Sequence, residues 1–164
     1  SLSASFLLGI GLPMVVFCLF SSGVLTNFLT LLATGIFLTF IFTAIAFVVA
    51  LKSENPIRGF GMAIFIWLFL SVIYDGILLV VMMYFESYPL DRFALIASLF
   101  NPVDLSRILI MLQLDISALM GYTGAVFRKF LGTGLGIAVA YGALVIWVVI
   151  PVVLFLRTAN KNDF

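Results

Sequence analysis

The chain has 164 residues, of which 65% are hydrophobic and only 9% are charged, and its formal net charge is +1. Soluble domains carry about 25% charged residues, so this chain cannot cover itself with a polar surface and belongs in lipid. The sequence has no basic patch that could neutralise several phosphates, so nucleic acid is not expected as a partner. It has no histidine and one cysteine, Cys18, which argues against a Ser-His-Asp hydrolase site, an internal disulfide and a thiolate-rich metal centre. We therefore expect no catalytic residue and no resident cofactor.

Long uncharged runs predict α-helical spans, because a helix satisfies its own backbone polar groups in lipid and about 20 apolar residues cross the bilayer. Spans are expected near residues 2–20, 24–51, 60–85 and 132–156. The fold class is thus an all-α integral membrane protein with about four transmembrane helices in a single transmembrane domain over residues 1–164. Since the chain begins inside an apolar run, we expect it to be part of a longer subunit.

The third expected span carries a carboxylate, Asp75, with Ser71 one helical turn before it. A charge in mid-membrane costs a few kcal/mol and faces a protein interior or a water-filled path, so it is a functional hypothesis by default. Asp75 could belong to a polar track or a gating contact. Alternatively, it could be a carboxylate satisfied by a hydroxyl or basic group from another helix.

Towards the outer end of the same span, Met82 and Met83 are soft ligands that could receive Cu(I). Methionine is also a routine filler of apolar packing, and adjacent residues on a helix diverge by about 100°. Packing is therefore the favoured interpretation, and no metal site is expected in this chain.

Residues 86–131 form a region of different character between the third and last spans. Asn101 followed by Pro102 predicts a helix start, and on a helix from 102 to 115 the charged residues Asp104, Arg107 and Asp115 form one stripe. About 14 residues are too few to span, so this helix should be re-entrant or interfacial. Its charges could dock a partner, or Asp104 and Arg107 could form a local pair.

Basic residues near the span ends give the orientation. Lys52 and Arg58 lie between the second and third spans, and Arg157 and Lys161 follow the last one. Both groups should anchor the cytoplasmic side, which places residues 86–131 outside. The pattern fits a multi-pass protein of the bacterial inner membrane.

Three strings resemble a known family: 67–75 (WLFLSVIYD), 101–108 (NPVDLSRI) and 121–127 (GYTGAVF), together with the final 157–164 (RTANKNDF). They resemble type-2 ABC exporter permeases, and more closely the permease of the nitrous-oxide reductase maturation transporter (NosY type). The resemblance implies the C-terminal portion of a subunit of about six helices, with a re-entrant pair of short helices before the last span. The N-terminal coupling helix of such permeases has no counterpart here.

The resemblance also implies partners. These are a second permease copy, a cytoplasmic ABC ATPase (NosF type) that binds ATP and magnesium, and a periplasmic copper-handling β-helix protein (NosD type), all around the lipid bilayer. The chain has no phosphate-binding loop, so ATP would bind to another subunit. Two other functions remain open: a generic type-2 exporter permease for lipid, drug or polysaccharide, and a non-transporting membrane scaffold.

Overall fold

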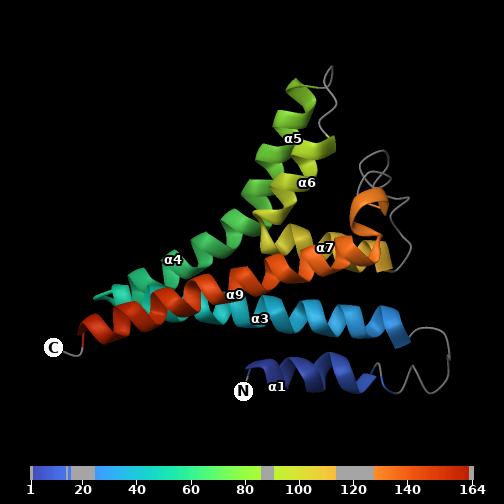
Figure 1. Cartoon of the computed structure of the whole chain (residues 1–164). Coiled ribbons are helices and arrows are strands. Elements are labelled where there is room, and N and C mark those ends of the chain that lie inside the picture. The colour runs from blue at the N-terminus through green and yellow to red at the C-terminus, as the bar shows by residue number, and fades with distance from the viewer. Residues whose placement is uncertain (1, 14, 16–24, 86–90, 114–127, 163–164) are drawn as a thin grey trace.

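The computed structural model describes residues 2–13, 15, 25–85, 91–113 and 128–162, and its elements within these ranges are all helices (Figure 1). The α-helices and the two π-helices, η1 and η2, follow one another as α1 (Leu2–Phe6), η1 (Leu7–Gly11), α3 (Leu25–Lys52), α4 (Pro56–Leu68), η2 (Phe69–Ile73), α5 (Tyr74–Tyr84), α6 (Asp91–Leu99), α7 (Pro102–Gln113) and α9 (Gly134–Asn162). The predicted all-α membrane fold is confirmed.

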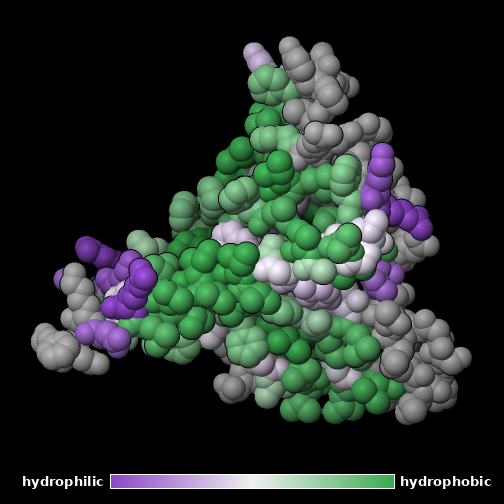
Figure 2. Space-filling view, viewed as in Figure 1, coloured by the Kyte–Doolittle hydropathy of each residue, from purple (hydrophilic) through white to green (hydrophobic). Residues whose placement is uncertain are grey.

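Three helical segments are long and apolar enough to cross a bilayer: Phe28–Lys52, Pro56–Tyr84 and Gly134–Asn160. They correspond to the second, third and fourth expected spans, and the third is continuous through α4, η2 and α5. The first expected span, 2–20, begins with α1 and η1, and residues 16–20 lie outside the described ranges. Many large hydrophobic side chains are accordingly exposed, and they cover most of the coloured part of the face shown in Figure 2.

The third span begins earlier than the sequence pattern suggested. We expected a loop over residues 52–58, but α4 starts at Pro56. The Asn55 side chain accepts a hydrogen bond from the Ile57 amide at 3.0 Å, and Pro56 occupies the first helical position. This is the same Asn-Pro start that was recognised at Asn101, because a capping oxygen and a proline with fixed φ both favour the first turn.

Helices α3 and α9 lie side by side and run in the same direction (Figure 1). The ring of Phe37 contacts Tyr141 at 6.0 Å between centroids, and Phe47 contacts Phe155 at 5.8 Å, so residue numbers rise together along both helices. The end of α3 and the end of α9 therefore lie at one end of the molecule.

We call this end, which carries Lys52, Arg58 and Arg157, the basic end. Hydrophilic side chains gather there in Figure 2, and all three residues are exposed. The other end, where α3 and α9 begin, is the far end. Because the third span leaves the basic end and the last span returns to it, the segment between them begins and finishes at the far end.

That connecting segment contains a sharply bent helix pair. Helices α6 and α7 meet at 113°, a geometry of a broken span or a re-entrant loop. Since α3 and α9 are parallel, the pair must enter and leave at the far end, which makes it re-entrant. Helix α7 packs on both α3 and α9, and its Leu105, Ile108 and Leu109 join the main core beside Ile41 and Leu144.

Candidate functional site: the elbow of the re-entrant pair

The segment joining α6 to α7, residues 99–102, lies deep in the molecule, and we call it the elbow. Its side chains and carbonyls bond to Leu70 and Trp147. Leu70 lies near the middle of the 29-residue span Pro56–Tyr84, and Trp147 near the middle of the 27-residue span Gly134–Asn160. The elbow therefore reaches about the mid-plane of the membrane.

A bend at this depth leaves the last carbonyls of α6 without helical partners, and lipid offers no donor to replace them. Side chains from neighbouring helices supply the missing donors. The Tyr74 hydroxyl donates to the Ala97 carbonyl at 2.6 Å, and the Trp147 indole N–H donates to the Leu99 carbonyl at 3.1 Å. The Ala97 carbonyl also accepts from the Phe100 amide at 3.0 Å. Both sides of the elbow are thus fixed, by α5 and by α9.

Asn101 performs two tasks at the bend and is completely buried. Its side-chain oxygen accepts from the Val103 amide at 3.1 Å, and its own carbonyl accepts from the Leu105 amide at 3.0 Å, which starts α7 as the sequence predicted. Its side-chain amide donates to the Leu70 carbonyl at 2.7 Å. Leu70 lies in the π-helix η2, where the wider i→i+5 turn replaces the α-helical bonding pattern.

The intramembrane carboxylate is paired across helices. Asp75, in the first turn of α5, forms a salt bridge with Arg107 of α7. The side chain of Asp75 is 24% exposed and that of Arg107 42%, so the pair lies at the edge of the packed interior. Asp75 is therefore satisfied by a basic group from another helix, and the salt bridge is equally a contact between two helices.

A second carboxylate, that of Asp104, lies close to the Asp75–Arg107 salt bridge. Asp104 lies one turn before Arg107 on α7, half-buried, beside the buried Ser98 and close enough to Asp75 and Arg107 to interact with both charges. Arg107 thus has two acidic neighbours. Its salt bridge is to Asp75 and not to Asp104, so the expected local pair is replaced by a bond between helices.

The other expected site residues are placed as follows. The hydroxyls of Ser71 and Ser106 are buried and have no hydrogen-bond partner among the described residues. Asp115 lies outside the described ranges, whereas Lys161 lies in the last turn of α9, at the basic end. Ser71 therefore adds no polar contact to Asp75 in this structure.

Met82 and Met83 face different surroundings. Met82 packs against the main core, whereas Met83 is 77% exposed. Their two thioethers do not converge on a common point, as expected for adjacent residues of a helix. Within the described residues, no group of three or more carboxylate, thiol or imidazole side chains could hold a metal ion.

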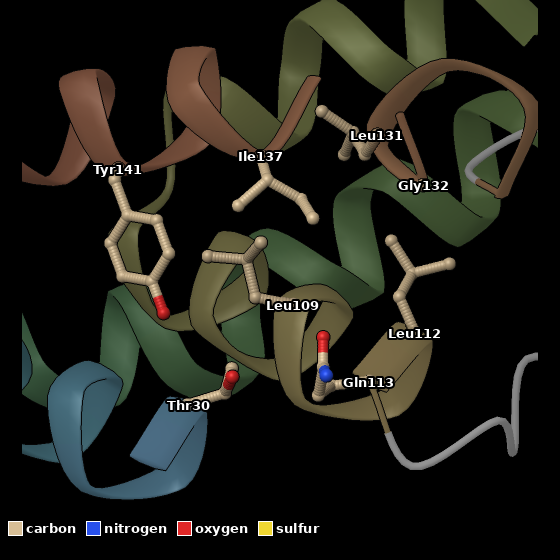
Figure 3. A pocket seen from close by; sticks show the side chains of 8 residues that line it. All are labelled: Thr30, Leu109, Leu112, Gln113, Leu131, Gly132, Ile137 and Tyr141. Carbon is tan, nitrogen blue, oxygen red and sulfur yellow. The ribbon is translucent and has the colours of Figure 1, made fainter. Parts of the chain in front are cut away.

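A small cavity of about 80 Å³ lies beside the last turns of α7, between them and the beginnings of α3 and α9 (Figure 3). Leu109 and Ile137 point into it, and Thr30, Gln113 and Tyr141 contribute polar groups to its wall. A few water molecules would fill it, whereas drug-sized ligands need about 300 Å³ or more. It is therefore too small to be a pocket for an organic substrate.

The sequence pattern singled out Asp75, Asn101, Asp104 and Arg107, but it did not predict that Arg107 bonds to Asp75 or that Asn101 bonds to Leu70. It did not find Tyr74 or Trp147, whose role depends on where the α6 carbonyls end. Comparison of the chain with protein families, curated proteins and solved structures finds no match.

Proposed function

We propose that this chain is the membrane-spanning permease part of an ABC transporter of the type-2 exporter kind, and that the elbow is its moving part. The observation that supports the proposal best is the re-entrant pair before the last span, joined to the third span by the Asp75–Arg107 salt bridge. The sequence resemblance implies a pair of short helices at the same place.

The Asp75–Arg107 salt bridge would break and re-form when α5 and α7 are moved apart and together. A lone charge in mid-membrane costs a few kcal/mol, so the two partners hold α7 against α5 while the site is dry. Both side chains are partly exposed, so water that reaches this edge would hydrate the separated charges and lower the cost of opening. Work applied to α5 or α9 would be passed to the elbow through Tyr74 and Trp147.

The energy source would be a separate subunit. We propose a cytoplasmic ATPase that binds ATP and magnesium at the basic end, beneath two copies of the permease. The far end would then face the periplasm of a bacterial inner membrane. There the elbow region would act on a copper-handling β-helix protein during maturation of nitrous-oxide reductase.

Isolation of the intact complex in mild detergent tests this proposal. Mass spectrometry should identify an ABC ATPase and a periplasmic β-helix protein with the chain, and ATP hydrolysis should accompany their recovery. Recovery of an ATPase without the β-helix protein would favour a generic exporter of lipid, drug or polysaccharide. Recovery of neither would contradict the proposal and favour a membrane scaffold.

A matched pair of variants tests the moving part. Asp75→Asn should leave assembly intact and lower maturation activity, whereas Asp75→Glu should retain the charge and most of the activity. Full activity of Asp75→Asn would show that the salt bridge is not part of the working cycle.

A further inference from the structure

An apolar groove of about 470 Å³ lies between α4 and α9, on the basic-end side of the elbow. Phe65 and Phe69 line it from the third span, Ile150 and Leu154 from α9, and Ile45 from α3. Phe65 is 59% exposed, Ile150 49% and Leu154 43%, so the groove opens sideways at the surface of the helices. Every lining residue belongs to a candidate membrane span, so hydrocarbon surrounds this opening.

The elbow closes one end of the groove. Leu70 and Trp147 line that end, and the same two residues hold the elbow through the Leu70 carbonyl and the Trp147 indole N–H. The indole N–H, the only polar side-chain group on the walls, is therefore already bonded. No side-chain donor or acceptor remains in the groove for a polar ligand or ordered water, which needs two to four polar partners.

The open end leads to two arginines. Arg157 follows Ile150 by seven residues and Leu154 by three, and Arg58 precedes Phe65 by seven, so both arginines share a helical face with the groove walls. Both are exposed. Ten residues separate Trp147 from Arg157, about 15 Å at 1.5 Å per residue, which equals half of the roughly 30 Å hydrocarbon thickness.

The groove is thus about as deep as one leaflet. Its walls are apolar, and the two arginines at its open end lie at the level of the lipid headgroups. We propose that the groove binds one acyl chain of an anionic phospholipid from the leaflet at the basic end, with the lipid phosphate held by Arg58 and Arg157. The end of the acyl chain would lie against Leu70 and Trp147, so the bound lipid would brace the elbow. This site is independent of the proposed transport function.

Quenching of tryptophan fluorescence tests the site directly, because Trp147 lines it. Trp67 is the other tryptophan, so a Trp67→Phe background leaves one reporter. The protein is reconstituted in phosphatidylcholine vesicles that contain a minor fraction of acyl-brominated phosphatidylglycerol or, separately, the same fraction of acyl-brominated phosphatidylcholine. Quenching should be at least twofold stronger with the anionic lipid. Equal quenching by the two lipids would overturn the proposal.

Matched variants locate the binding. Arg157→Gln should remove most of the preference for the anionic lipid, whereas Lys129→Gln, an exposed charge before α9, should retain it. Ile150→Phe should fill the groove and reduce quenching, whereas Val149→Phe should not, since Val149 is equally exposed at 49% but does not line the groove. Persistence of the preference in both Arg157→Gln and Ile150→Phe would overturn the assignment to this groove.

Discussion

The parallel α3–α9 pair and the elbow are held together by different forces. The α3–α9 contact includes the ring pairs Phe37–Tyr141 and Phe47–Phe155, and no salt bridge joins these two helices within the described residues. The elbow is held by hydrogen bonds from Asn101, Tyr74 and Trp147 to backbone carbonyls. In lipid, apolar side chains gain little by leaving their solvent, so close packing and polar contacts decide helix association. The elbow is therefore the more specific region and the more sensitive to single substitutions.

Asn101→Ala should have the largest effect, because it removes the cap of α7 and leaves the buried Leu70 carbonyl without its donor. The two losses together should cost about 3 kcal/mol. Thermal unfolding in detergent, followed by circular dichroism, measures the change.

Asn55→Ala is the matched control, since Asn55 caps α4 in the same Asn-Pro start but is exposed. It should cost about 1 kcal/mol. Equal losses for the two variants would show that the bond from Asn101 to Leu70 adds nothing to the cap.

Trp147→Phe should cost about 1–2 kcal/mol, because the Leu99 carbonyl loses its donor at mid-membrane depth. Tyr74→Phe should cost less, since the Ala97 carbonyl keeps the Phe100 amide as a partner. Thermal unfolding monitored by circular dichroism compares the stability losses of the two variants. Trp67→Phe, at an exposed position, is the control and should be close to neutral. A larger loss for Tyr74→Phe than for Trp147→Phe would contradict this description of the elbow.

The Asp75–Arg107 salt bridge should contribute a coupling free energy of about 1 kcal/mol. A double-mutant cycle with Asp75→Asn and Arg107→Gln measures it from the unfolding of the single and double variants. Each single variant leaves one charge without its partner. The stability losses of the two single variants should therefore add up to more than the loss of the double variant. A coupling free energy of zero would show that the pair is not a structural contact in the membrane.

Gly142→Ala should have the smallest effect, a gain of about 0.5 kcal/mol, because a methyl group at this position meets no atom within 4 Å and alanine favours the helix. Gly76→Ala, beside the salt bridge in α5, meets equally open space and should behave in the same way. Unfolding measurements on both variants check this. A clear loss at either glycine would mean that another molecule packs against that helix face.

The sequence predicted the long spans, because twenty or more apolar residues leave few alternatives in lipid. It also predicted the start of α7 at Asn101-Pro102 and directed attention to Asp75. It could not supply the partner of Asp75, since several basic residues were available and pairing depends on how α6 and α7 bend. The same Asn-Pro signal at Asn55 starts α4, although it lies inside the charged stretch 52–58 that separates two apolar runs.

The roles of Tyr74 and Trp147 were beyond sequence reasoning for a different reason. Aromatic residues are abundant in every span, and most of them face lipid or pack against other helices. Only the position of the carbonyls at the end of α6 distinguishes these two. The π-helix η2, which presents the Leu70 carbonyl to Asn101, likewise has no pattern of apolar residues that separates it from the α-helix around it.

The central claim is that α6 and α7 enter the membrane and return to the same side. Single cysteines at positions 93, 129 and 157, introduced after replacement of Cys18 by serine, can be labelled with a membrane-impermeant maleimide from each side of sealed vesicles. The re-entrant fold predicts that positions 93 and 129 react from one side and position 157 from the other. Reaction of position 93 from the same side as position 157, opposite to position 129, would show that the bent pair crosses the bilayer and would contradict the account.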